Sequence, residues 1–283
     1  MEYYEKDTLK KLQRIELMIF KDFDDFCLAN GISYAIIGGT AIGAVRHGGF
    51  IPWDDDIDVM MDSKSYKKFI ILAKEKMCDK YYILNRETDP HVPVMNTHLC
   101  LKGTEFRTSD QYNVKKTGIF LDIFCFDNLP DDEDKMRWQW KKAWTWGKLM
   151  TLAEIKNPVI MCHGLKKKII ASALKISHYF LNIIGLTPDR CYKKALHYRS
   201  LYNDKETNRI GYFFDTSLFM ELCERRDIFP TKRMKYENIM VNAPNNIDKY
   251  LSDAYGDFMT LPPEEKRHNH KPDVLDFGKY IDL

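Results

Sequence analysis

The sequence predicts an α+β protein in which a mixed β-sheet is flanked by helices and interrupted by a helical insertion. Short runs rich in β-branched and aromatic residues alternate with longer stretches whose apolar residues recur every three or four positions. The middle of the chain, by contrast, shows only the helical spacing. With 283 residues and 45% hydrophobic content, the chain is long enough for one large domain or two modest ones.

The elements are expected in a definite order along the chain. Residues 7–28 carry an amphipathic helical pattern that stops at Asn30-Gly31. A short buried strand is predicted at 32–37, and a helix should run from Ser63, its N-cap, to about residue 76. Further strands are predicted at 81–84, at 98–102, within 118–126, at 209–214 and at 236–241, and a last helix at 246–255.

These elements divide the chain into three parts. Residues 1–130 should form the core, residues 131–203 a helical subdomain without convincing strands, and residues 204–283 a mixed part that completes the core. The turn chemistry at 128–134 marks the first boundary.

A tight turn follows the first predicted strand. Gly38 and Gly39 allow backbone conformations that other residues resist, and they let phosphate oxygens approach the main chain. Thr40 is a natural N-cap for a short helix over 41–47, whose free N–H groups would attract phosphate. Arg46 adds a planar fork of donors suited to phosphate. The turn therefore predicts a phosphate site.

An acidic strand comes next. Alternate residues of a strand share a face, so Asp56 and Asp58 should point to one side while Ile57 and Val59 face the core. Two carboxylates about 7 Å apart along a strand can hold one or two magnesium ions, with substrate phosphates completing the shell. The spacing therefore predicts a divalent-metal site.

Three more acids bear on this site. Asp54 and Asp55 either add negative charge to it or belong to a solvated loop. Asp122 lies in the middle of an apolar run, where a charge is costly unless a cation or a hydrogen-bond network meets it. It either completes the metal site with Asp56 and Asp58 or pairs with a nearby lysine or arginine.

Three blocks in the same order resemble the LicD family, the choline-phosphotransferase-like branch of the nucleotidyltransferase superfamily. They span residues 38–61, 118–130 (GIFLDIFCFDNLP) and 250–267 (YLSDAYGDFMTLPPEEKR). The resemblance implies a nucleotidyltransferase-like core in which Asp56, Asp58 and Asp122 bind metal and catalyse. The gap between the glycines and Asp56 is longer than in most of the superfamily. The implied substrate-binding residues are Gly38, Gly39, Thr40, Arg46, His47, Trp53 and Asp55.

The resemblance also implies a function. It is a metal-dependent phosphotransfer with Mg²⁺ or Mn²⁺, in which a phospho-alcohol, foremost phosphocholine, moves from a CDP-activated donor such as CDP-choline. The acceptor would be a hydroxyl of a cell-surface glycan, such as lipopolysaccharide or teichoic acid, or of its lipid-linked precursor. The alternatives are transfer of another phospho-alcohol or a sugar phosphate, nucleotidyl transfer, and a non-catalytic scaffold that binds nucleotide or glycan. A sugar-nucleotide glycosyltransferase also uses a DxD pair, but the glycine turn and Asp122 argue against it.

Two features of the middle part leave alternatives open. The tryptophans Trp138, Trp140, Trp144 and Trp146 either pack in a core or form an aromatic cage for a quaternary ammonium group such as choline. Residues 164–186 combine basic residues with an amphipathic pattern, and they either form a buried helix or lie on an anionic membrane surface. Polar residues within the span argue against a membrane-crossing helix.

Composition limits the expected partners and the expected cellular location. The net charge of +2 and scattered basic residues argue against a nucleic-acid partner. Seven dispersed cysteines suggest reduced thiols, and residues 1–11 lack the apolar stretch of a signal peptide, so the expected location is cytoplasmic, peripheral to the inner membrane face if 164–186 contacts lipid. His268 and His270 have the spacing of weak metal ligands, but solvent exposure is the simpler expectation.

Overall fold

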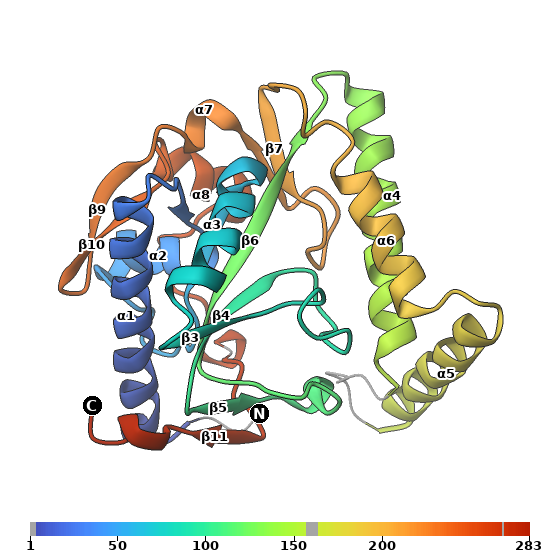
Figure 1. Ribbon diagram of the computed structural model, residues 1–283, viewed down its shortest axis with the longest axis horizontal. Helices are drawn as coiled ribbons and strands as arrows, with labels where there is room; N and C mark the ends of the chain where they lie inside the picture. Colours follow the sequence, from blue (N-terminus) through green and yellow to red (C-terminus); the bar gives the residue numbers. More distant parts are fainter. Residues whose placement is uncertain (1–3, 157–163, 268) are drawn as a thin grey trace.

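The computed structural model describes residues 4–156, 164–267 and 269–283. Its centre is a seven-stranded mixed sheet with the strand order β1-β2-β6-β4-β3, to which β7 and β8 are added beside β6 (Figure 1). Strands β2 and β6 run parallel, and the other neighbours run antiparallel. The predicted α+β class is confirmed.

The described elements have the following bounds. The helices are α1 (Lys6–Ala29), α2 (Gly38–His47), α3 (Ser63–Lys76), α4 (Glu133–Glu154), α5 (Gly164–Ile183), α6 (Pro188–Arg199), α7 (Arg225–Ile228) and α8 (Ile247–Tyr255). The sheet strands are β1 (Ala35–Ile36), β2 (Asp58–Asp62), β3 (Tyr81–Leu84), β4 (Thr97–Leu101), β6 (Phe120–Leu129), β7 (Arg209–Tyr212) and β8 (Glu221–Glu224). Two separate pairs are formed by β9 (Lys232–Tyr236) with β10 (Ile239–Ala243), and by β5 (Glu105–Arg107) with β11 (Val274–Asp276).

Helix α1 covers the core with the apolar stripe that the sequence predicts. Leu12, Ile15, Ile19 and Phe23 lie on one side of the helix and are fully buried. Burying four such side chains contributes about 6–12 kcal/mol of hydrophobic stabilisation before entropy is counted. The helix, at the left of Figure 1, thereby packs its apolar side against the core that it shares with the sheet.

Some local predictions are wrong. Ser63 is not the N-cap of α3, because Asp62 holds that position and accepts the Ser65 N–H at 2.8 Å. The strand predicted at 32–37 is only β1, two residues long. The strand predicted at 236–241 is the hairpin β9–β10, with Glu237 at a positive φ of 52° in its turn.

The helices α4, α5 and α6 follow β6 and lie together at the right of Figure 1. α4 packs against both α5 and α6. A buried ion pair between Arg199 of α6 and Asp127 of β6 ties this helical part to the sheet, and Arg199 also donates to the Cys125 carbonyl at 3.1 Å. Strand β7 then returns the chain to the edge of β6.

Three of the four tryptophans of α4 pack at separate places instead of forming a cage. Trp140 is fully buried against Phe213 at a ring distance of 4.9 Å. Trp144 donates its indole N–H to the Asp215 carbonyl at 2.9 Å, and Trp138 packs edge-on against Tyr198. Core and interface packing accounts for these three residues.

Within the described ranges, no single helix is long and apolar enough to span a bilayer; the segments Lys168–Ile183 and Pro188–Arg199 reach the required composition only as a pair bent by 86°.

Candidate active site

Two of the predicted aspartates lie side by side at the start of neighbouring strands. In the parallel pair β2–β6, Asp58 is directly opposite Asp122. The Asp122 N–H donates to the Ile57 carbonyl at 2.9 Å, which fixes this register. Ile57 and Val59 are fully buried, as the alternation predicts, so the carboxylates occupy the other face. Asp56 lies just before β2 rather than within it.

The glycine turn presses against these acids. Gly38 has a positive φ of 56°, and a Cβ built there would lie 3.0 Å from an Asp58 carboxylate oxygen. A Cβ on Gly39 would lie 2.5 Å from an oxygen of Asp54. Any side chain at either position would displace a carboxylate, so the turn requires glycine for close approach as well as for its backbone angle.

Thr40 has a different role from the one predicted. Helix α2 begins at Gly38, with Ile37 at the N-cap position, so Thr40 lies inside the first turn. Its hydroxyl is buried and accepts the Asp58 N–H at 2.8 Å, which anchors the start of β2. The N-cap prediction is therefore wrong, because the chain enters the helix three residues earlier.

The first turn of α2 retains unpaired donors. The Gly38 N–H points to the Tyr250 hydroxyl at a long 3.5 Å. In the part of the chain that the structure describes, the N–H groups of Gly39 and Thr40 make no hydrogen bond. Such N–H groups and the helix dipole favour an anion at this end.

Asp122 is oriented by two neighbours from the strand beside it. The Asn96 amide donates to its Oδ1 at 2.8 Å, and His98 Nε2 approaches the same oxygen at 3.0 Å. Burial lowers the pKa of His98, but the charge of Asp122 outweighs it and raises the pKa to about 10. Among the described residues nothing donates to Oδ2, so this oxygen is open to a ligand. The ion-pair partner of Asp122 in the described residues is a histidine, not the lysine or arginine of the alternative.

Like charges crowd the site. Burial raises the pKa of Asp58 well above its usual range, and the charges of Asp56 and Asp122 raise it further. Burial and the charges of Asp56 and Asp55 raise the pKa of Asp54 in the same way. Asp55 is 1% exposed. The solvated-loop alternative is therefore wrong for Asp55, whereas Asp54 is partly exposed.

A further acid was missed by sequence reasoning. Glu16 of α1 is 2% exposed, and its Oε2 has no hydrogen-bond partner within the described chain. Burial raises its pKa, and the charges of Asp55 and Asp56 raise it further. The available signal was its position on the apolar stripe of α1 between Ile15 and Ile19, where an acid is costly.

Asp55 joins the two ends of the chain rather than lining the turn. It accepts the Tyr4 hydroxyl at 2.8 Å and the backbone N–H of His270 at 2.8 Å. The His270 side chain is largely exposed, as expected, yet its Nδ1 lies 3.2 Å from an oxygen of Asp56. Hydrogen bonding to Asp55 and Asp56 raises the pKa of His270. His268 lies outside the described residues.

The remaining predicted residues form a basic and aromatic rim. Arg46 donates to the Phe258 carbonyl at 2.7 Å and to the His47 ring at 3.0 Å, so part of its fork is already used. The rings of His47 and Trp53 meet edge-on, and the Arg267 guanidinium lies 4.6 Å from the centre of the Trp53 ring. Burial lowers the pKa of Arg46, and the charge of Arg267 lowers it further, which indicates that the two cations are neighbours.

A divalent cation fits the chemistry of this cluster. Carboxylate oxygens are the ligands that magnesium prefers, and a cation would relieve the repulsion among Asp56, Asp58 and Asp122. The His98 hydrogen bond to Asp122 is the kind of outer contact that orients a metal-binding carboxylate. In the described ranges, however, no three histidine, cysteine or acidic side chains form a preformed metal site. Metal binding therefore stays a prediction.

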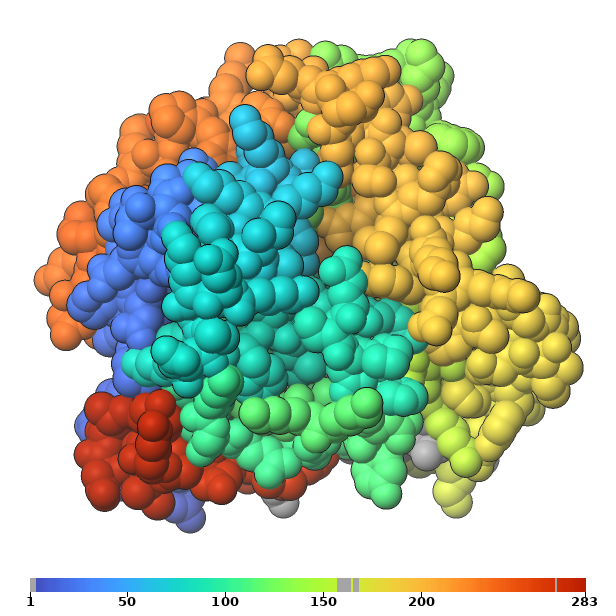
Figure 2. Space-filling model, viewed as in Figure 1, coloured from blue at the N-terminus to red at the C-terminus, as the bar shows by residue number. Residues whose placement is uncertain are grey.

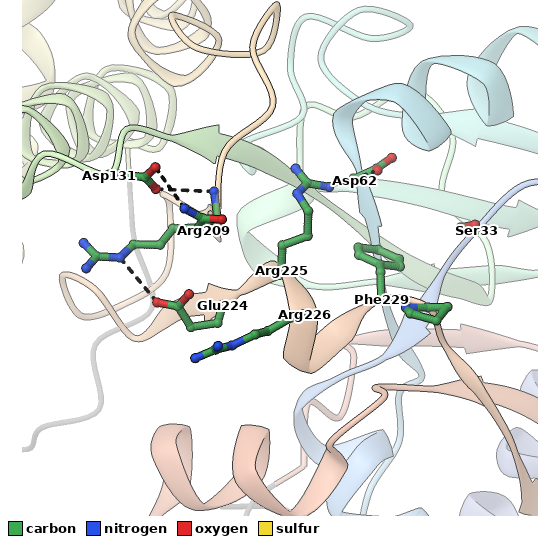
Figure 3. A pocket seen from close by; sticks show the side chains of 10 residues that line it. Ser33, Asp62, Asp131, Arg209, Glu224, Arg225, Arg226 and Phe229 are labelled. Atoms are coloured by element: carbon green, nitrogen blue, oxygen red, sulfur yellow. Dashed lines mark hydrogen bonds and ion pairs between the residues drawn. The ribbon is translucent and has the colours of Figure 1, made fainter.

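A separate cavity of about 950 Å³ lies at the other end of β2 (Figure 3). Asp62 on its wall is four residues beyond Asp58, about 13 Å along the strand. Its charged side chains largely pair with one another: Arg225 approaches Asp62 at 3.5 Å, and Arg209 approaches Glu224 at 3.4 Å. None of the predicted site residues lines this cavity.

Known proteins share this sequence pattern. Residues 31–155 match the family model described as "LicD/FKTN/FKRP, nucleotidyltransferase domain". Over 268 residues the chain is 30% identical to the protein named "Lipopolysaccharide cholinephosphotransferase LicD" of Haemophilus influenzae, covering 94% of this chain and 96% of that protein. Shorter matches are 45% identical over 56 residues to an uncharacterized protein of Rickettsia typhi (20% of this chain, 18% of that protein) and 48% over 50 residues to one of Rickettsia prowazekii (18% of each). Because the first relative is matched over almost its whole length, and the family model spans both Asp58 and Asp122, this chain belongs to the LicD family.

Proposed function

We propose that this chain transfers phosphocholine from CDP-choline to a hydroxyl group of lipopolysaccharide or of its lipid-linked precursor. Membership of the LicD family supports a LicD-like transferase, and the relative from Haemophilus influenzae is named for phosphocholine transfer involving lipopolysaccharide. The observation that carries the proposal is the pairing of Asp58 with Asp122 across β2 and β6, beside a helix start with unpaired N–H groups. The carboxylates and the N–H groups that can donate hydrogen bonds to a phosphate therefore lie next to each other.

The donor would bind along the glycine turn. Its pyrophosphate oxygens would accept the N–H groups of Gly39 and Thr40, where the dipole of α2 favours negative charge. Arg46 and Arg267 add positive charge at the rim, and Trp53 offers an aromatic surface beside them. These groups hold the donor with its phosphorus atoms toward the carboxylates.

Asp56, Asp58 and Asp122 would hold Mg²⁺, or Mn²⁺ in its place. When bound, such an ion supplies neutralisation of the charge that develops on the phosphate oxygens. The acceptor hydroxyl oxygen forms a bond to the phosphorus that carries choline, and the bond from that phosphorus to the CMP oxygen breaks. Asp122 Oδ2 would orient the hydroxyl and take its proton, because a general base must lie within hydrogen-bond reach and His98 occupies the other oxygen. The products are the phosphocholine-bearing glycan and CMP.

A donor screen tests this function. The purified chain would be incubated with Mg²⁺ and CDP-choline, CDP-ethanolamine or CDP-glycerol, with and without lipopolysaccharide, and CMP would be measured by mass spectrometry. We expect CMP from CDP-choline that requires both Mg²⁺ and the acceptor. If CMP were released only from another CDP-alcohol, the transferred group would be that phospho-alcohol and not phosphocholine. Pyrophosphate released from a nucleoside triphosphate would indicate nucleotidyl transfer, and binding without turnover of any donor would indicate a scaffold.

We also infer that α5 rests on an anionic membrane surface, where a lipid-linked acceptor is found. Ile169, Ile176 and Ile183 recur every seven residues on one side of α5, and they are 61%, 68% and 82% exposed. Lys168 and Lys175 are exposed next to this apolar stripe. Helix α5 forms a projecting edge of the molecule (yellow in Figure 2), so the buried-helix alternative does not account for its outer side. Apolar residues flanked by lysines are typical of helices that lie in the interface of an anionic bilayer.

The variant Ile176→Glu combined with Ile183→Glu tests this contact. It should bind vesicles containing phosphatidylglycerol at least about tenfold more weakly than the wild type in sedimentation assays, because two apolar side chains become charged. Transfer to a water-soluble, delipidated oligosaccharide should be unchanged. Ile71→Glu on α3, which is 67% exposed, is the matched control and should keep vesicle binding. Equal vesicle binding by all three proteins would rule out the contact.

A further inference from the structure

One face of β6 is accessible beside Asp122. From Phe120 to Phe124 the strand alternates partly exposed and buried residues, so Phe120, Asp122 and Phe124 share the accessible face. From Cys125 onward every residue of the strand is buried. Two aromatic rings therefore flank the candidate catalytic carboxylate, each about 7 Å from it along the strand.

The surroundings of the two rings differ. His98 is stacked on Phe120 with a ring distance of 4.2 Å, so its imidazole covers one face of that ring. Phe124 instead meets Tyr212 of β7 at a right angle, with the ring centres 5.0 Å apart. Tyr212 is in turn tilted by 78° from Phe214. In such edge-to-face pairs the edge of one ring rests on a face of the other, so the corner offers a cation the ring faces that lie outside these contacts.

Charges of both signs lie close to this corner. Burial raises the pKa of the Tyr212 phenol; the charge of Arg199 opposes that rise, and the charges of Asp122 and Asp215 add to it. The Arg199 guanidinium is buried in an ion pair and lies 5.6 Å from the centre of the Phe214 ring. The Phe214 ring is thus already in contact with a cation, and Phe124 with Tyr212 is the pair better placed to contact a bound ammonium group.

This corner suits one kind of cation in particular. A quaternary ammonium group has no N–H to donate, so it is held by ring faces and by the charge of carboxylates rather than by hydrogen bonds. A primary ammonium group keeps three donors and needs an acceptor for each. Aromatic walls beside two carboxylates therefore favour a trimethylammonium group over the ammonium of ethanolamine.

We propose that Phe124 and Tyr212 form the walls of a subsite for the trimethylammonium group of the donor, with Asp122 and Asp215 supplying the opposing charge. This inference rests on the proposed phosphocholine transfer, and it adds which residues select choline. It places ammonium recognition on β6 and β7, next to the reacting phosphorus, and not at the tryptophans of α4.

Calorimetric binding tests the subsite independently of turnover. The Kd values of CDP-choline and CDP-ethanolamine would be measured with Mg²⁺ for the wild type and for Phe124→Leu. We expect the wild type to prefer CDP-choline. Phe124→Leu should weaken CDP-choline about 5- to 30-fold and CDP-ethanolamine less than about twofold, because a quaternary ammonium group depends on the ring faces whereas a primary ammonium group can be held by hydrogen bonds. Phe124→Tyr should restore the preference. Trp138→Leu, a half-exposed tryptophan of α4, is the control and should leave both Kd values unchanged.

The outcomes separate the two ideas. Equal weakening of both donors in Phe124→Leu, or a wild type that binds both equally, would overturn the subsite. The wild-type comparison decides even if Phe124→Leu does not fold. A wild type that prefers CDP-choline but releases no CMP in the presence of acceptor would contradict the proposed transfer while supporting the subsite. A wild type that binds neither donor would overturn both.

Discussion

Replacing Asp58 with asparagine is expected to lower CMP release from CDP-choline by about a thousandfold, because preorganised charge at a reacting phosphate is among the largest contributions to catalysis. The substitution keeps the size of the side chain and leaves the backbone N–H of residue 58 bonded to Thr40. Since burial and neighbouring acids raise the pKa of Asp58, removing its charge also relieves repulsion. The thermal midpoint of Asp58→Asn should therefore equal or exceed that of the wild type, so that lost activity is not explained by unfolding.

The matched control for this variant is Asp62→Asn at the far end of the same strand. Asp62 caps α3 through its carboxylate, and asparagine caps a helix about as well. Because this residue lies on the separate cavity and not at the carboxylate cluster, turnover should stay within about threefold of the wild type. Magnesium-dependent turnover by Asp58→Asn at the wild-type rate would disprove the assigned role of this residue.

The second large effect concerns Glu221, whose carboxylate accepts the hydroxyls of Tyr250 and Tyr255. Burial raises the pKa of Glu221 from 4.5 to about 7, and the charge of Asp215 contributes to the rise. The folded state therefore holds this proton more tightly than the unfolded state, and stability falls as the pH rises from about 4.5 to about 7. The shift corresponds to roughly 3 kcal/mol of unfolding free energy. Tyr250 also receives the Gly38 N–H, so this ionisation occurs next to the glycine turn.

Glu221→Gln should remove that part of the pH dependence. Urea unfolding at pH 5 and pH 8 would give the free energies, and the variant should be more stable than the wild type at pH 8 by up to about 3 kcal/mol. Glu224→Gln, on the same strand but partly exposed, keeps Glu221 and should follow the wild-type curve. Parallel curves for the wild type and Glu221→Gln would mean that Glu221 is not held neutral by its surroundings.

Much of the framework is predictable from local pattern. The apolar stripe predicts α1 to within one residue at each end, and the strand at 81–84 is predicted without error. Asp58 and Asp122 are predictable as partners because each interrupts a strongly apolar strand, and buried charge needs a reason. Local capping is harder: Asp62 and Ser63 are adjacent and have similar N-cap preferences, so the pattern cannot choose between them.

Other parts of the site depend on distant contacts that leave no local signal. Tyr4 and His270 both bind Asp55, although they come from opposite ends of the chain. In the turn of the β9–β10 hairpin the left-handed position is held by Glu237 rather than by the neighbouring Asn238, whose residue type is the usual one for that conformation. Its side chain accepts the Phe50 N–H at 3.0 Å, so a tertiary contact supports the turn.

The contacts that cover the acidic cluster come from residues that are synthesised much later than the cluster itself. Arg46 meets Phe258 and Asp55 meets His270 across 212 and 215 positions, and β11 pairs with β5. A ribosome makes the strands that carry Asp58 and Asp122 long before it makes these partners. We therefore expect the growing chain to hold these mutually repelling carboxylates without their C-terminal contacts, so that the candidate active site is among the last regions of the protein to mature.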